Sequence, residues 1–189
     1  MGKMGSFKLS GLEELQEEIR KLQNPDTFVE ACAKDLAARL LAMVVERTPV
    51  GDYSHEVEVT AKRDSKNHKK GDVYKKKVNP SGKMGGTLRR GWTSASHEEA
   101  ESGNGKPQAP QILEHANGLE ISRLGNILKV EIINPVEYAS YVEFGHRSAN
   151  HKRWVSGQFM MTISERNLQS IAPRILERKI RQYLERVIK

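Results

Sequence analysis

The chain has 189 residues, of which 37% are hydrophobic and 29% are charged, as in a polar globular protein large enough to bury one core. No apolar run reaches the roughly 20 residues that a membrane helix needs, and a single cysteine, Cys32, excludes an internal disulfide and a cysteine-rich zinc site. The length predicts one domain over 1–189. Because there is no apolar signal-peptide core near the N-terminus, we expect the protein to be made in a cytosol-like compartment and to have no membrane partner.

The net charge of +7 is concentrated in one segment. Between Thr60 and Lys83 there are nine basic residues and two acidic ones, whereas the rest of the chain carries 22 of each. The basic character is therefore a property of this segment and not of the whole surface.

Two helices are predicted at the N-terminal end. Ser10 with Glu13 marks the start of the first, which extends to Leu22, and Thr27 with Glu30 marks the start of a longer one that ends at Thr48. The apolar stripe of the longer helix should form half of the core, with Cys32 as a buried thiol; its members are Val29, Cys32, Ala33, Leu36, Leu40, Met43 and Val44.

The segment 51–86 has a different pattern. Short alternating stretches at 55–59 and 73–78 are joined by lysine- and asparagine-rich residues around Gly71, which predicts a protruding basic hairpin or long loop. Because its apolar content is low, we expect it to be mobile unless a partner orders it.

The following segments predict the main sheet. Residues 87–96 alternate and are interpreted as its first strand, 98–110 as a polar linker, and 119–132 as a hairpin that turns at Gly125.

A short aromatic helix is predicted over 134–147. Asn134 can cap its N-terminus, Pro135 suits the first helical position, and Gly145 supplies the left-handed residue that ends it. A polar loop at 148–157 and a C-terminal helix over 162–189, kinked or divided by Pro173, complete the chain.

Motifs for catalysis are scarce. There is no glycine-rich phosphate loop and no nucleophile elbow. Glu143 and His146 have the Glu-x-x-His spacing of di-metal sites, but the motif occurs once, and Gly145 should end the helix before His146. A metal-dependent hydrolase using this pair is kept as a third hypothesis; His146 and Arg147 bonding the last helix carbonyls is the simpler explanation. We therefore expect no catalytic residue, cofactor or metal.

Two groups of residues remain as candidate binding elements. The aromatic side chains at 138, 141 and 144 suit a ligand box or stacking platform, although core or interface packing is the more frequent use of such a stripe. The basic segment suits a solvated loop and a nucleic-acid contact about equally. Tyr74 is its only aromatic, so recognition of single strands or of sequence is not indicated.

Several motifs together resemble a known family. They are Thr48-Pro49-Val50, Gly86-Thr87-Leu88-Arg89-Arg90-Gly91-Trp92, Asn134-Pro135-Val136-Glu137-Tyr138-Ala139, Tyr141-Val142-Glu143-Phe144-Gly145, Trp154-Val155 and Gly157-Gln158-Phe159-Met160. In this order they resemble the minor tail-component, or tail-completion (gene-product-ten-like), neck protein family of long-tailed bacteriophages, over most of 27–189. Two departures are the insertion of 51–86 between the first two motifs and Ser156, which stands where the family usually has proline.

The resemblance implies an α+β fold in which a curved antiparallel sheet packs against the long N-terminal-half helix and the C-terminal helix. It also implies a structural, non-enzymatic virion protein of the tail or neck, made in the bacterial host cytoplasm. Such a protein completes the tail and helps join it to the head as one copy of a ring. Its expected partners are copies of itself, the head–tail connector, and tail-terminator or tail-tube proteins, with possible non-specific contact to packaged DNA.

The residues expected to act fall into two sets. The expected interface comprises Tyr138, Tyr141, Phe144, His146, Arg147 and Trp154. The expected contacts with DNA or an acidic partner are Lys69, Lys70, Lys75, Lys76 and Lys77. The alternative function is a nucleic-acid-binding module that uses the basic insertion at 60–83.

Overall fold

The computed structural model describes residues 25–82, 85–125 and 127–187, so the helix expected over 10–22 lies outside the described residues. The chain divides into two compact units. The helical unit contains, within the described residues, 25–47, 108–133 and 159–187, and the motif unit contains 48–107 and 134–158 apart from 83–84. The elements are α2 (Pro25–Arg47), β1 (His55–Thr60), β2 (Val73–Val78), α3 (Thr87–Gly91), α4 (His97–Ser102), α5 (Ala109–Gly118), β3 (Ile121–Leu124), β4 (Ile127–Val130), α6 (Ala139–Phe144), β5 (Gly145–Arg147), β6 (Trp154–Ser156) and α7 (Met160–Val187).

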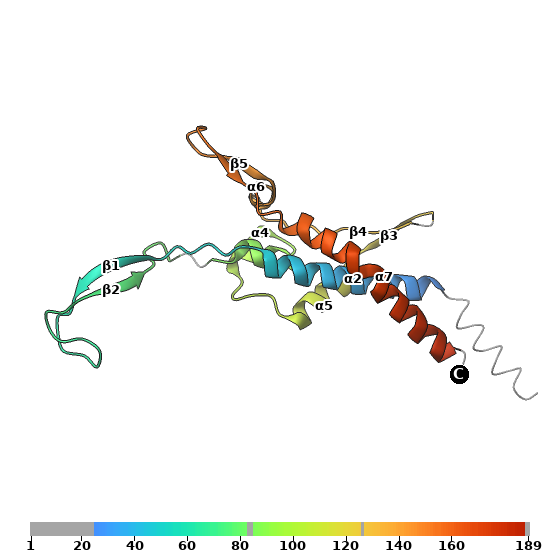
Figure 1. Ribbon diagram of the computed structural model, residues 1–189, viewed down its shortest axis with the longest axis horizontal. Helices are drawn as coiled ribbons and strands as arrows, with labels where there is room; N and C mark the ends of the chain where they lie inside the picture. Colours follow the sequence, from blue (N-terminus) through green and yellow to red (C-terminus); the bar gives the residue numbers. More distant parts are fainter. Residues whose placement is uncertain (1–24, 83–84, 126, 188–189) are drawn as a thin grey trace, which may run out of the picture. The chain divides into compact units, whose positions relative to one another are not determined.

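In the helical unit, α2 packs against α5 and α7 (Figure 1). It begins at Pro25, two residues before the predicted Thr27, because proline suits the first turn, where no backbone N–H is needed. Its buried stripe differs in part from the predicted one, since it keeps Cys32 and Val44 but leaves Val29 exposed. The buried apolar side chains of the unit are Cys32, Ala37, Leu41, Val44, Val45, Ile112, Ala116 and Met160.

The C-terminal helix α7 is continuous through Pro173, so of the two effects predicted for this proline, a kink or a division, the division does not occur. The lost backbone N–H removes one intrahelical bond, while two contacts with α2 hold the helix on the C-terminal side of the proline. Phe28 stacks on Tyr183 with ring centroids 4.4 Å apart, and Lys179 lies 3.5 Å from the carboxylate of Asp35.

The predicted hairpin at 119–132 is confirmed as the antiparallel pair of β3 and β4. Gly125 supplies the positive φ of 59° that its turn requires. Arg123 on β3 donates a 2.7 Å hydrogen bond to the carboxylate of Asp26, which fixes the hairpin to the first turn of α2.

In the motif unit, the strand predicted over 87–96 is wrong, because Thr87–Gly91 forms the helix α3. Leu88 and Trp92 share a face in both structures, since positions four apart meet on a helix and alternate positions meet on a strand. Both side chains are 5% exposed.

The predicted linker at 98–110 contains a helix and the start of another. Ser96 caps α4 by accepting the Glu99 N–H at 3.2 Å, and the Glu99 carboxylate accepts the Ala95 N–H at 2.7 Å. The Pro110 that suggested a linker lies in the first turn of α5, where proline is favoured.

The α+β class is confirmed, and the strands within the described residues form three separate two-stranded antiparallel sheets. The hairpin predicted in 51–86 is confirmed as the pair of β1 and β2. The large curved sheet that the resemblance implied is not assembled from these pairs, because α3 replaces the strand that should have begun it. None of the described helices combines the length and the apolarity needed to cross a membrane.

The aromatic helix is shorter than predicted. Asn134 does not cap it, because its side chain accepts the Val136 N–H at 3.1 Å and donates to the Leu88 carbonyl at 2.8 Å, and α6 begins only at Ala139. Gly145 ends it with a φ of 86°, as predicted, and opens β5. The predicted polar loop at 148–157 is partly wrong, since Trp154–Ser156 forms β6.

Candidate interaction surfaces

Three of the quoted motifs meet at one point of the motif unit, which we call the motif junction (Thr48, Arg89, Trp92 and Asn134). The indole N–H of Trp92 donates to the Thr48 hydroxyl at 2.7 Å, and the Arg89 guanidinium donates to the Thr48 carbonyl at 3.0 and 2.6 Å. Thr48 is fully buried, so these bonds satisfy polar groups that water cannot reach.

Gly91 allows the third motif to approach the junction. A Cβ atom at this position would lie 2.2 Å from Asn134 Oδ1 and 2.7 Å from Val136 Cγ2. Any larger side chain would therefore push Asn134 away from the Leu88 carbonyl that it binds. The glycine of the second motif and the asparagine of the third are thus explained by packing.

Arg90 occupies a second buried position in the same helix. Its guanidinium donates to the carbonyl of Ala100 at 2.7 Å and to that of Gly85 at 3.3 Å, and the side chain is 6% exposed. It therefore connects α3 to α4 and to the segment that precedes α3. The two consecutive arginines therefore have a structural role, since both donate hydrogen bonds to backbone carbonyls inside the motif unit.

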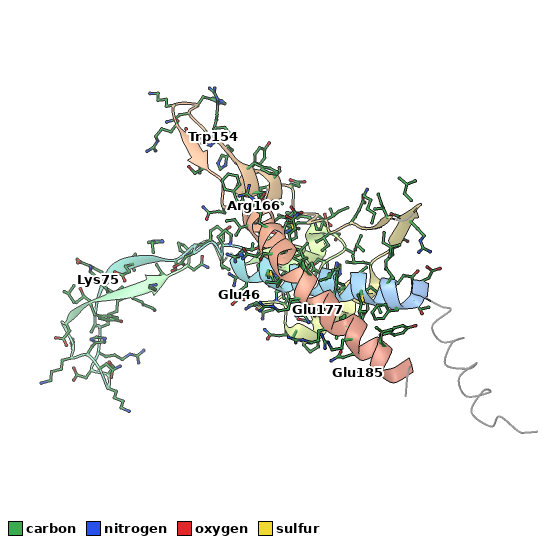
Figure 2. All side chains as sticks on the ribbon, turned by 45° about the vertical axis from the view of Figure 1, so that its right-hand side comes forward. Glu46, Lys75, Trp154, Arg166, Glu177 and Glu185 are labelled. Carbon is green, nitrogen blue, oxygen red and sulfur yellow. The ribbon has the colours of Figure 1, made fainter. Side chains whose placement is uncertain are left out.

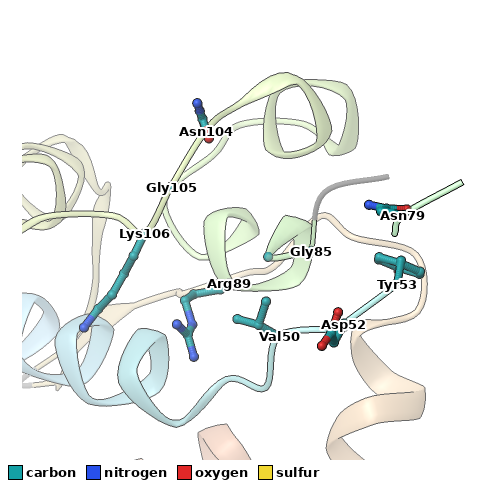
Figure 3. A pocket seen from close by; sticks show the side chains of 11 residues that line it. Val50, Asp52, Tyr53, Asn79, Gly85, Arg89, Asn104, Gly105 and Lys106 are labelled. Carbon is teal, nitrogen blue, oxygen red and sulfur yellow. The ribbon is translucent and has the colours of Figure 1, made fainter. Parts of the chain in front are cut away.

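A pocket of about 430 Å³ lies beside the junction (Figure 3). Its lining includes Arg89, whose guanidinium already binds the Thr48 carbonyl. Gly85 and Gly51 also line it and lie close together, since a Cβ at Gly85 would lie 2.0 Å from Gly51 O. This close approach joins the two ends of the 51–86 segment. The remaining lining is formed by Val50, Asp52, Tyr53, Asn79, Gly86, Asn104, Gly105 and Lys106.

The first candidate surface is the aromatic arm, which we define as 139–157 with α6, β5 and β6. Three large aromatic side chains of the arm are exposed to solvent: Tyr141 is 58% exposed, Phe144 61% and Trp154 62%. Figure 2 labels Trp154 on this hairpin. These three aromatic side chains therefore do not pack in the core of the described unit.

The arm brings several predicted interface residues together. Arg147 is paired with Trp154 across the two strands, and His146 with Val155. The Tyr141 and His146 rings meet edge to face with centroids 5.9 Å apart. Paired positions share a face, so Arg147 and Trp154 form one side of the hairpin and His146 the other.

Tyr138 lies apart from these exposed aromatics. Burial raises the pKa of its hydroxyl above the ordinary value, with a further contribution from nearby Tyr53, while a hydrogen bond with Thr87 opposes the shift. It is 38% exposed and so belongs partly to the packing around the start of α3.

The second candidate surface is the basic hairpin, defined as β1, β2 and the loop 61–72. The three consecutive lysines of β2 do not form one basic face, because neighbouring residues of a strand point to opposite sides. Lys75 and Lys77 lie opposite Glu58 and Glu56, while Lys76 lies opposite Val57. Lys75 also lies 3.9 Å from the carboxylate of Glu56.

Apart from Lys76, the cations of this hairpin that have no facing carboxylate are on its loop. The two acidic side chains of the loop accept backbone N–H groups: Asp64 accepts that of Lys70 at 2.6 Å, and Asp72 that of Lys69 at 2.7 Å. No ion pair within the described part of the chain uses the basic side chains of the loop, which are Lys62, Arg63, Lys66, Lys69 and Lys70.

Residues 13–145 match the model of the family described as "Bacteriophage HK97-gp10, putative tail-component", which spans more than two thirds of the chain. The chain belongs to this family. The predicted relationship is therefore confirmed, and the protein is a structural component of a phage tail. No curated protein and no solved structure matches it.

The Glu-x-x-His pair of this tail component does not form the geometry that its spacing suggested. Glu143 is on α6, but His146 follows Gly145 onto β5, so the two do not share a helix face. Within the described residues no group of three or more His, Cys, Asp or Glu side chains could hold a metal ion.

Proposed function

We propose that the protein completes the tail at its head-proximal end, as one copy of a ring that helps to join tail and head. Membership of the tail-component family supports the tail assignment. The observation that carries the finer proposal is the aromatic arm, whose three large exposed side chains need a protein surface to cover them.

The arm is suited to anchor such an interface. Large aromatic side chains each contribute about 1.5 to 3 kcal/mol when they are fully buried, and aromatic and arginine residues dominate interface energetics. Tyr141, Phe144 and Trp154 supply the aromatic area, and Arg147 lies opposite Trp154.

The base of the arm is also closely packed. A Cβ at Gly157 would lie 2.2 Å from Glu143 O, and one at Gly145 would lie 2.4 Å from Val155 O. Because the hairpin is locked onto the end of α6, little ordering cost remains when a partner binds. The partners we propose are further copies, the connector, and the tail-terminator or tail-tube proteins.

The test is the double substitution Phe144→Ala with Trp154→Ala. We expect normal thermal stability, because both side chains are exposed, together with loss of the ring in sedimentation velocity and absence of the protein from purified particles. Leu124→Ala is the control, since Leu124 is 81% exposed on a different hairpin. A double variant that still forms rings and enters particles would contradict the proposal.

A second function, non-specific contact with packaged DNA, is supported by the cations of the loop 61–72, which form no ion pair with the described part of the chain. It predicts that replacing Lys66, Lys69 and Lys70 by Glu abolishes duplex binding, and that wild-type binding falls steeply with salt. Replacing Lys75 and Lys77, which face carboxylates, should weaken binding less. Equal loss in both variants would argue against a loop contact.

A further inference from the structure

The two strands of the basic hairpin carry opposite charge. β1 has Glu56 and Glu58 and no basic residue apart from His55 at its first position, whereas β2 has three consecutive lysines and no acid. Within the described residues each strand pairs only with the other, so both outer edges have unpaired backbone groups. The hairpin thus presents one acidic edge and one basic edge.

The backbone register shows which residues face outward at these edges. In an antiparallel pair, residues that bond across the pair alternate with residues whose N–H and C=O groups point away. The Ala61 N–H donates to the Asp72 carbonyl at 2.8 Å, so position 61 points inward. Glu58, three positions earlier, therefore points its backbone outward, and so does its partner Lys75.

Because outward-pointing residues recur at every second position of a strand, the residues two positions away from Glu58 and Lys75 also point their backbone groups outward. Glu56 and Lys77 form the next outward pair. All four of these side chains lie on one face of the hairpin, because directly opposite residues share a face. A strand added to either edge would thus form backbone hydrogen bonds with the charged residues themselves, and its side chains would lie next to theirs.

Charge selects among the ways in which two hairpins can join. Pairing β1 with β1 of a second copy sets glutamates beside glutamates, and pairing β2 with β2 sets lysines beside lysines, which destabilises adjacent strands. Pairing β1 of one copy with β2 of the next repeats the Glu–Lys alternation that the hairpin already has. It also keeps all copies in the same strand direction, as rotation about a ring axis requires.

The opposite face of the hairpin favours the same arrangement. It is mainly apolar: Val57, Val59, Tyr74 and Val78 lie on it and are half-buried, with the exposed Lys76 opposite Val57. A single two-stranded sheet is marginally stable in water, and hairpins joined in a row would extend this apolar face into a strip across many strands.

We infer that neighbouring copies join through their basic hairpins, with the acidic edge of β1 on the basic edge of β2 in the next copy. This inference rests on the ring proposed above and identifies one of its contacts. Such a contact is heterologous, so it closes into a ring when the rotation per copy allows closure.

The test uses two variants with edges of a single sign, E56K/E58K and K75E/K77E, in the full chain. Sedimentation velocity should show rings for the wild type, and self-association weakened by about tenfold or more for each variant alone. An equimolar mixture should assemble, because the lysine edge of one variant meets the glutamate edge of the other. Mixing cannot repair a defect confined to a single chain, so this recovery identifies a contact between copies.

The outcomes separate the two proposals. If the wild type forms rings and both variants keep them, the hairpin contact is wrong and the ring stands. A wild type that is monomeric at every concentration contradicts both. Two variants that stay dissociated when mixed, or rings that require added duplex DNA, also overturn the hairpin contact.

Discussion

The indole N–H of Trp92 donates a 2.7 Å hydrogen bond to the hydroxyl of Thr48, a residue 44 positions earlier in the chain. Both side chains are buried. Thr48→Val keeps the shape of the side chain and removes the acceptor, which leaves a buried N–H unsatisfied. We expect a loss of about 1 to 3 kcal/mol in the free energy of unfolding, measured by urea denaturation followed by circular dichroism.

Thr48→Ser is the matched control, because it retains the hydroxyl. It should cost clearly less than Thr48→Val. A cost for Thr48→Ser with none for Thr48→Val would mean that the methyl group, and not the hydrogen bond, stabilises the junction.

Gly91→Ala should destabilise the protein even though alanine is the better helix former. The added Cβ would meet Asn134 Oδ1 at 2.2 Å, and overpacking of this kind costs about 1 to 3 kcal/mol. Gly118→Ala, in helix α5, adds the same atom where nothing lies within 4 Å. Thermal unfolding should show a lower melting temperature for the first variant only; a lowered value for both would refute the packing argument.

Arg90→Met should cost about 1 to 3 kcal/mol in unfolding free energy, because it leaves the Ala100 carbonyl without its buried guanidinium donor. Arg90→Lys should recover only part of this, since an ammonium cannot reproduce a planar fork of donors. Urea unfolding measures both variants. If lysine restored full stability, positive charge alone would be sufficient.

Cys32 should react slowly with a thiol reagent in the folded protein. Burial raises the pKa of its thiol above the ordinary value, so the folded state retains the thiol proton to a higher pH than the unfolded chain does. Its contribution to folding is therefore complete below the ordinary thiol pKa and decreases as pH rises above it.

The measurement is the rate of labelling at pH 8 with and without urea, which should be slow in the first case and fast in the second. Thr60→Cys in a Cys32→Ala background provides an exposed thiol as the rate standard. Labelling of folded Cys32 at the rate of this standard would show that the thiol is accessible.

Sequence patterns predicted those elements whose determinants are local. The basic hairpin and the turn at Gly125 were found because alternation and a glycine with positive φ specify them. The α+β fold class was predicted correctly because most of the helices and hairpins have such local determinants. Patterns could not distinguish α3 from a strand, because Leu88 and Trp92 share a face in either structure, and the bond from Trp92 to Thr48 that fixes the helix is distant in sequence.

The candidate surfaces were predicted unevenly. The aromatic residues of the arm were identified, but their exposure was not, since a stripe of tyrosine and phenylalanine looks the same in a core and on a surface. The lysines of β2 were found as a run, yet their division between two faces needed the register with β1. The capping role assigned to Asn134 failed because Leu88, 46 residues away, binds its side chain.

The contact between Gly51 and Gly85 has a consequence for the evolution of the segment that it closes. With its two ends held together there and at the motif junction, the chain between them can change length while the motif unit keeps its anchors. Each doubling of a flexible loop costs only about 0.6 kcal/mol in closure entropy. Such a hairpin can therefore be gained, lengthened or lost in small evolutionary steps while the packing of the motif unit stays the same.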